Sequence, residues 1–219
     1  MNNNPLKFVL LVLFTLITFQ GYSQRIEVTG FGGFQFGGSI DFIEGDLKIK
    51  DNGNYGGMID FAITPRVMLE LGYTRMDTRA EWRPYPFYQA PPFNYERRDF
   101  GASVEYFQIG SLKNFGDPDG AFIPFSLLTA GLVRFNDKEF RGEDTWRFSV
   151  LLGGGMKYFI NDIVGIRLQG RLMLPMFFDG VGGYVGIGTG GPSTGLGVNT
   201  TIPIVQGDIT GGLVFRIRK

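Results

Sequence analysis

Residues 145–174 read TWRFSVLLGGGMKYFINDIVGIRLQGRLML, two segments of alternating side chains on either side of Asn161-Asp162. In the first segment, large apolar residues stand at nearly every second position from Trp146, with Arg147 and Lys157 among the residues between them. A repeat of two is the period of a β-strand, in which successive side chains point to opposite faces. The stretch therefore predicts a β-hairpin whose strands each have one apolar and one polar face.

The same alternation recurs on both sides of this hairpin and predicts eight strands. Each core is about nine to eleven residues long or a little longer, the length that a tilted strand needs to cross the hydrocarbon of a membrane. An even number of strands brings both ends of the chain to one side. The expected strands are Arg25–Phe36, Tyr55–Ile63, Val67–Thr74, Asp99–Tyr106, Ile123–Phe135, Thr145–Tyr158, Val164–Leu174 and Asp208–Ile217.

The connections between these strands alternate in size. Short turns on one side and long loops on the other are typical of a β-barrel that crosses a membrane. We expect tight turns at Thr64–Arg66, Gly116–Gly120 and Asn161–Asp162, and long loops at 38–53, 77–97, 136–144 and 179–203.

In such a barrel the apolar face of each strand points outward to lipid and the polar face points inward. This rule gives a definite prediction for two of the strands. In the strand at 99–106 we expect outward side chains at Phe100, Ala102, Val104 and Tyr106, and in the strand at 123–135 at Ile123, Phe125, Leu127, Val133 and Phe135.

The charged residues on the polar faces predict a network inside the barrel. An eight-stranded barrel is just wide enough for side chains to fill it, and a charge left unpaired there is costly. In a soluble β-sandwich, the alternative fold, the same residues would form a solvated surface. The expected lumenal network consists of Asp60, Glu70, Asp99, Glu105, Arg134, Arg147, Lys157, Arg167, Arg171, Asp208 and Arg216.

The N-terminus has the pattern of an export signal. Lys7 precedes an apolar run at 8–19, which is short for a membrane span, and small residues at 21 and 23 form a cleavage motif. We expect a signal peptide at 1–23 and a single barrel domain at 24–219; an uncleaved N-terminal anchor is the alternative. Without cysteine no lipid can be attached at the N-terminus.

Composition agrees with a barrel and excludes several classes of protein. The chain has 34 glycines and 22 phenylalanines, and aromatic residues favour strands and the girdles of membrane barrels. Its 21 basic and 21 acidic residues balance, so nucleic acid is not an expected partner. Without cysteine there is no disulfide, and the fold must be held by hydrogen bonds and burial.

These features together resemble the small outer-membrane β-barrels of Gram-negative bacteria, of the OmpA, OmpX and OmpW type. The resemblance covers the whole chain after the signal peptide and is one of pattern, without a shared motif. It implies location in the cell outer membrane, contact with outer-membrane lipid and lipopolysaccharide, and insertion by the barrel-assembly machinery. Such barrels typically end on an aromatic residue, whereas here Phe215 has the outward register and four residues follow it to Lys219.

Enzymatic and metal sites are restricted by the absence of histidine. Outer-membrane lipases and acyl-transfer enzymes resemble one another in using a histidine base with a serine or a carboxylate. This chain cannot build such a site. Glu70 with Glu105 is a conceivable acid–base pair, but a lumenal salt bridge is the simpler interpretation.

The Asp117–Gly120 stretch has calcium-type ligands but fits a hairpin turn better. The glycine-rich run 180–197 lacks a phosphate-loop lysine and predicts a flexible external loop. We expect no cofactor.

The second long loop is the most promising surface for binding. Its aromatic residues are stiffened by four prolines, and aromatic residues with arginine are typical of binding hot spots. The alternative is that the rings lie among lipid headgroups or cap the barrel. The candidate contact residues are Trp82, Arg83, Tyr85, Phe87, Tyr88, Phe93 and Tyr95.

The sequence thus predicts an all-β, eight-stranded antiparallel transmembrane barrel without catalytic activity, with a structural or surface-binding role through its long loops. Two alternatives stay open. Glycines on the inner faces would leave space for a narrow, porin-like channel for small or apolar solutes. A soluble exported barrel would instead bind an apolar ligand.

Overall fold

The computed structural model describes residues 25–217 apart from 42–43, 138–144, 189–190 and 202–203. The predicted signal peptide at 1–23 lies outside this part of the chain. Within it, no helix is long and apolar enough to cross a membrane.

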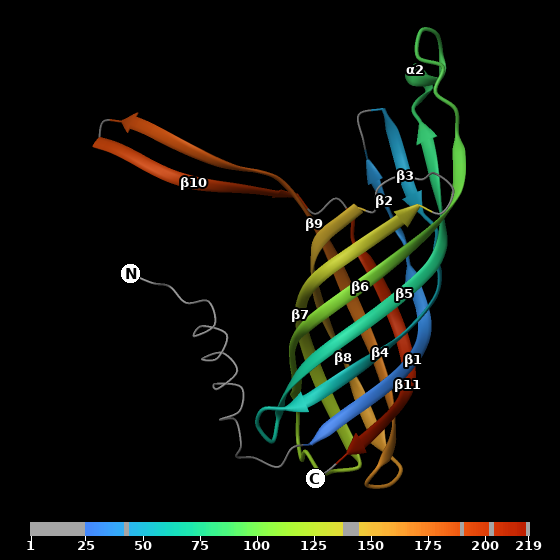
Figure 1. Cartoon of the computed structure of the whole chain (residues 1–219), viewed down its shortest axis with the longest axis vertical. Helices are drawn as coiled ribbons and strands as arrows, with labels where there is room; N and C mark the ends of the chain where they lie inside the picture. Colours follow the sequence, from blue (N-terminus) through green and yellow to red (C-terminus); the bar gives the residue numbers. More distant parts are fainter. Residues whose placement is uncertain (1–24, 42–43, 138–144, 189–190, 202–203, 218–219) are drawn as a thin grey trace, which may run out of the picture.

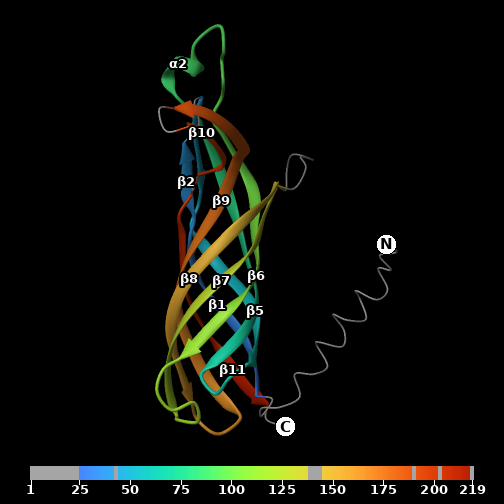
Figure 2. The same cartoon turned by 90° about the vertical axis from the view of Figure 1, so that its left-hand side faces the viewer.

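Eight long antiparallel strands close into a barrel, as predicted (Figures 1 and 2). β1 pairs with β4 on one side and β11 on the other, and the β5–β6 pairing closes the ring. Closure leaves no unpaired strand edge within this ring of eight strands, which is what a strand structure in lipid requires. The strands of the barrel are β1 (Ile26–Phe36), β4 (Asn52–Ala62), β5 (Val67–Pro84), β6 (Arg98–Asn114), β7 (Phe122–Asp137), β8 (Thr145–Phe159), β9 (Val164–Gly188) and β11 (Gln206–Ile217).

The three predicted tight turns lie together at one end of the barrel, beside the start of β1 and the end of β11 (Figure 1). Each is closed by short polar contacts. The Thr64 hydroxyl accepts a hydrogen bond from the amide of Val67 at 3.0 Å, and the Asn161 carboxamide oxygen accepts one from Val164 at 2.7 Å. Such side-chain caps satisfy backbone groups that leave the sheet.

The long connections at the other end are more regular than predicted. The 38–53 segment contains the hairpin of β2 (Gly38–Asp41) and β3 (Gly45–Ile49), and β3 pairs with the upper part of β5. The 77–97 segment is strand as far as Pro84 and then contains α2 (Pro86–Gln89). The expectation of a flexible loop at 180–197 was wrong, since β9 pairs there with β10 (Gly191–Thr201). Strand pairing continues beyond the barrel because it satisfies backbone hydrogen bonds. Of the 136–144 loop, residues 138–144 are outside the described part.

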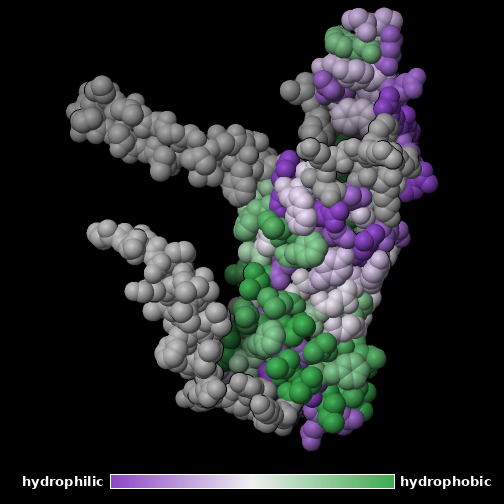
Figure 3. Space-filling model, in the orientation of Figure 1, coloured by the Kyte–Doolittle hydropathy of each residue, from purple (hydrophilic) through white to green (hydrophobic). Residues whose placement is uncertain are grey.

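Figure 3 shows apolar side chains over the half of this face of the barrel that is nearer the tight turns, and exposed apolar residues on every barrel strand continue this apolar belt around the barrel. On β8 it extends from Trp146 to Tyr158, both about half exposed. Strands tilted by about 40° at about 3.3 Å per residue span roughly 30 Å over that distance, the thickness of a bilayer. No other part of the described chain covers these side chains, so the belt faces lipid and the soluble alternative does not fit.

Two strands have the opposite facing to the one predicted. In β6 and β7 the apolar residues Val104, Tyr106, Phe125 and Val133 are buried inside the barrel, and Leu132 points outward. The prediction failed because the upper part of β6 rises above the belt, where the outward face is polar. It failed in β7 because both faces are apolar. In the other six strands the predicted faces agree with the observed burial.

Cysteine labelling tests the facing of β7, because the chain has no cysteine of its own. Leu132 is 47% exposed and its neighbour Val133 is 0% exposed. We expect a membrane-permeant maleimide to label the Leu132→Cys variant in folded protein and to leave Val133→Cys unlabelled until denaturant is added. The reverse pattern would restore the facing predicted from sequence.

Candidate functional site

A dense ion-pair network fills the lumen near the tight turns. Lys157 Nζ lies 2.6 Å from Glu27 Oε2 and 3.3 Å from Asp60 Oδ2. Arg167 bridges Asp60 at 3.0 Å and Glu70 at 2.6 Å. All five side chains are almost completely buried. Buried charges are tolerated only when they are paired, and here each acid has at least one base.

Glu27 is a centre of this network that the sequence-based list of charges lacks. Besides Lys157, its carboxylate lies 3.2 Å from Arg216 Nε and 3.6 Å from Arg25 Nε. Its position on the inward face of β1 was readable from the alternation. Its central role was not, because it depends on which strands meet when the barrel closes.

A second polar group lies further along the lumen, toward the mouth. Arg171 donates two hydrogen bonds to Asp208, one of them from Nε at 2.9 Å, and a third to the Thr74 hydroxyl at 3.1 Å. Asn54 donates to Asp208 at 2.7 Å and links it to Gln35. Above these residues, Tyr106 donates to the carboxamide of Gln206.

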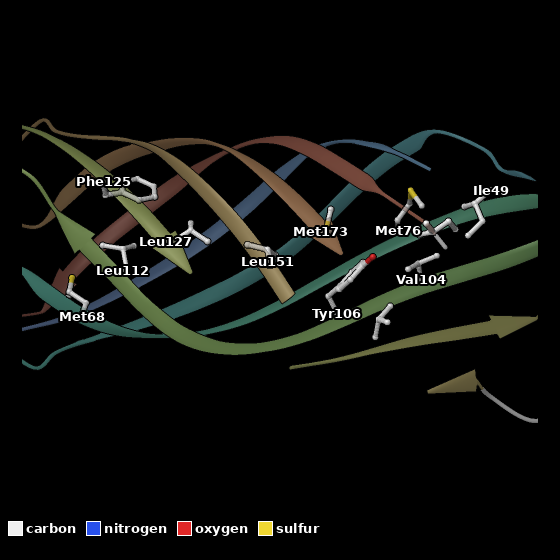
Figure 4. Packing of buried hydrophobic residues seen from close by; sticks show 12 residues of the cluster. Ile49, Met68, Met76, Val104, Tyr106, Leu112, Phe125, Leu127, Leu151 and Met173 are labelled. Atoms are coloured by element: carbon white, nitrogen blue, oxygen red, sulfur yellow. The ribbon is translucent and has the colours of Figure 1, made fainter. Parts of the chain in front are cut away.

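Apolar side chains fill the rest of the lumen (Figure 4). They come mainly from β5, β6, β7 and β8 and are buried from Met68, near the turns, to Ile49, at the mouth. The two fillings interlock, because the Phe125 ring lies 4.6 Å from the Arg167 guanidinium and 5.5 Å from the Lys157 amine. The inner faces of β6 and β7 are apolar because their side chains pack within this cluster and, at Phe125, against the lumenal bases.

Three of the predicted lumenal charges lie outside the lumen. Asp99 is exposed beyond the barrel, 2.7 Å from Lys50 and 3.0 Å from Arg79. Hydrogen bonds from these two bases, the larger effect coming from Lys50, hold the pKa of the Asp99 carboxyl below its usual range. Glu105 and Arg134 lie on the outer wall, 3.2 Å apart. The prediction was wrong for all three because it rested on the wrong facing of β6 and β7.

Arg147 has the inward register of β8 but lies at its mouth end and is only half-buried. Its guanidinium donates to the backbone carbonyl of Trp146 at 2.8 Å. The residues that the structure does bring into the lumenal network are Asp60, Glu70, Lys157, Arg167, Arg171, Asp208 and Arg216.

The conceivable acid–base pair does not exist. Glu70 is inside the barrel, whereas Glu105 is on its outer wall, held by Tyr73 at 3.0 Å and by Arg75 at 2.9 Å. The Asp117–Gly120 stretch forms the β6–β7 turn, with the Gly120 amide donating to the Asp117 carbonyl at 3.1 Å. Among the described residues, no group of three histidine, cysteine or acidic side chains is placed to hold a metal ion.

One wall of the barrel continues beyond the mouth. β5 and β6 remain paired as far as Trp82 and Arg98, and β3 pairs with β5 beside them (Figure 1). The face of this sheet that lines the lumen below becomes accessible above. It carries Leu47, Trp82 and Phe100, one from each strand.

These residues line an open cleft of about 720 Å³. Tyr95 and Asn94 approach from the loop after α2, and the charged residues Glu44, Glu96 and Arg98 complete the lining. Glu44 and Glu96 have no ion-pair partner within the described part of the chain. The cleft thus combines three aromatic rings with an excess of one negative charge.

The candidate contact residues of the loop separate into three groups. Trp82 and Tyr95 line the cleft. Phe87, Tyr88 and Phe93 pack on one another at the tip, and Tyr88 and Phe93 also pack on Tyr95, with ring centroids 5.1 to 6.2 Å apart. Arg83 pairs with Glu81 at 2.8 Å, and Tyr85 is exposed at the start of α2.

Removing one member of the lumenal network should be costly. We expect Arg171→Met to lower the free energy of unfolding by about 3–5 kcal/mol, because Asp208 is left buried without its base. Arg171→Met combined with Asp208→Leu should cost less than the single change, since no uncompensated charge remains. Urea titrations in lipid vesicles measure both, and a double variant that is the less stable of the two would contradict the pairing.

No family model and no curated protein matches the chain. Solved structures do. The outer membrane protein OprG of Pseudomonas aeruginosa aligns with a TM-score of 0.55 at 12% identity, over 90% of this chain and 97% of that one. Neisserial surface protein A aligns with a TM-score of 0.53 at 14% identity, over 88% and 97%.

A third match, the outer membrane protease OmpT of Escherichia coli, aligns over 90% of this chain and 98% of that one at 8% identity. Its TM-score of 0.46 is too low to carry an argument about activity. The two stronger matches concern the fold alone, and they agree with the closed ring of strands. The chain is therefore a small eight-stranded β-barrel of the outer-membrane type.

Proposed function

We propose that this protein is a non-enzymatic integral protein of the outer membrane that binds a cationic ligand in the cleft above its mouth. The observation that carries the proposal is the cleft itself, which is lined by Trp82, Tyr95 and Phe100 together with Glu44 and Glu96, two acids without ion-pair partners in the described chain. Aromatic faces attract cations, and carboxylates add to that attraction. A lysine or arginine side chain of a peptide has this chemistry.

The filled lumen supports a role at the surface over transport through the barrel. Lys157 and Tyr106 are fully buried at different levels of the lumen, and each is held by bonds that cross from one wall to another. A solute would have to break this ion pair and this hydrogen bond to pass. The glycines of the inner faces, which suggested a channel, are covered by neighbouring side chains and backbone.

The absence of catalysis belongs to the proposal too. The chain has no histidine, and its two glutamates that suggested acid–base chemistry lie on opposite faces of the sheet. The outer leaflet lipid, lipopolysaccharide and the barrel-assembly machinery are the partners that this location implies.

Planar-bilayer recordings test the closed lumen. We expect refolded protein, checked by its heat-dependent gel migration, to give no steady conductance steps, because the ion pairs and apolar residues block the lumen. Reproducible single-channel openings would favour the channel instead.

Trp82 provides a direct probe of the cleft. The chain has two tryptophans, and Trp146 lies on the outer wall, so a Trp146→Phe background leaves Trp82 as the only indole. We expect a tri-lysine peptide to change its fluorescence saturably and a tri-glutamate peptide to have no effect. Glu44→Gln with Glu96→Gln should weaken the binding about tenfold, since loss of about 1.4 kcal/mol corresponds to that factor.

Phe87→Ala is the matched control for this titration. Phe87 is 72% exposed at the loop tip and does not line the cleft, so its loss should leave the affinity for tri-lysine unchanged. Equal binding of both peptides, or equal loss of affinity in the control, would remove the cleft as a cation site.

A further inference from the structure

The outer wall carries a groove that no step of the proposed function uses. It crosses β1, β4, β5 and β6 within the apolar belt and has a volume of about 630 Å³. Its floor is formed where Thr29, Met58, Gly72 and Gln108 stand side by side in the inward register of the four strands, so that no side chain of this row fills the groove. The groove is therefore a depression in the lipid-facing surface.

The two sides of the groove differ. The side nearer the tight turns is a continuous aliphatic ridge, since Val28, Ile59, Leu71 and Ile109 are register partners across the four strands. The other side is the next outward row, Gly30, Gly57, Tyr73 and Phe107. Tyr73 and Phe107 pack with their ring centroids 5.1 Å apart. These two rings close this side of the groove on β5 and β6, whereas Gly30 and Gly57 leave it open on β1 and β4.

The two glycines are not required by the packing of the backbone. A Cβ atom at Gly30 would meet nothing within 4 Å, and one at Gly57 would meet only the Thr29 carbonyl oxygen at 3.5 Å, an ordinary contact. Glycine weakens a strand, so a pair of glycines side by side needs a reason. Here the two glycines, which have no side chains, leave an open path out of the groove.

This path leads to polar groups. The next outward row beyond the glycines contains Gly32, Tyr55, Arg75 and Glu105. Arg75 lies 2.9 Å from both Asp77 and Glu105, and the Tyr55 hydroxyl donates to Asp77 at 3.2 Å. An occupant that fills the groove and follows the glycines thus has an apolar body and a polar end, the polar end lying toward the mouth.

We propose that this groove holds one acyl chain of a membrane lipid, with the lipid's polar head beside Tyr55 and Arg75. The graded polarity along the groove fits an amphipathic molecule. A second copy of the chain fits less well, because a symmetric interface brings the same patch of both subunits together and two facing depressions would leave a void. The proposal rests on the membrane location and is independent of ligand binding in the cleft.

Filling the groove tests this. Gly57→Leu and, as a second variant, Gly30→Leu place a side chain in it at positions where the backbone has room. The control is Gly170→Leu on β9, an outward glycine outside the groove whose Cβ would meet only the Asp208 carbonyl oxygen at 3.8 Å. The readout is native mass spectrometry of protein extracted from membranes in mild detergent.

We expect one retained lipid per molecule in the unchanged protein and in the Gly170→Leu control, and at least about tenfold lower occupancy in both groove variants. Equal occupancy in all four proteins would overturn the proposal. So would an unchanged protein that is dimeric and becomes monomeric in the groove variants, because the groove would then hold a second copy. Protein that carries no lipid and is released from membranes by carbonate would contradict the membrane location itself.

Discussion

The pairing of charges inside a space that excludes water is the condition on which this structure depends. The lumen near the turns holds Glu27, Asp60 and Glu70 together with Lys157 and Arg167, all nearly inaccessible to solvent. An isolated charge in such surroundings is very unfavourable, so every one must find its partner across the barrel. This condition fixes the register of the strands more strictly than the apolar outer face does, because lipid accepts many arrangements of apolar residues whereas ion pairs accept few.

The extension of β3, β5 and β6 beyond the closed ring produces the cleft above the mouth. Inside the membrane, all eight strands contribute to a closed ring, and their inner faces meet one another. Above it, β5 and β6 stay paired with each other and β3 pairs with β5, and the inner face of these three strands lines the cleft. Trp82 and Phe100 thus have the inward register of the strands but are half-buried and line the cleft.

The fold was predictable from sequence because alternation, turn residues and loop spacing all agree, as they do for Val164–Leu174 and its turn at Asn161. The facing of β6 and β7 was not, because the rule of apolar outside and polar inside holds only where lipid is outside and charges are inside. Tyr106 and Phe125 break it since both belong to the buried apolar cluster of the lumen, where the Phe125 ring also lies beside the Arg167 guanidinium. The cleft was predictable only in part. Trp82 and Tyr95 stood out by composition, whereas Leu47 and Phe100 join them through strand pairing distant in sequence.

The position of Glu27 on the first strand has a consequence for assembly. Its partners Lys157 and Arg216 are 130 and 189 residues away along the chain, on β8 and on the last strand. Until the first and last strands meet, Arg216 is separated from Glu27, and Lys157 lacks Glu27 as the second acid beside Asp60. Contacts so distant in sequence form slowly. Closure of the barrel and neutralisation of its interior are therefore one late, cooperative step, and intermediates that lack the final strand should not persist in the bilayer.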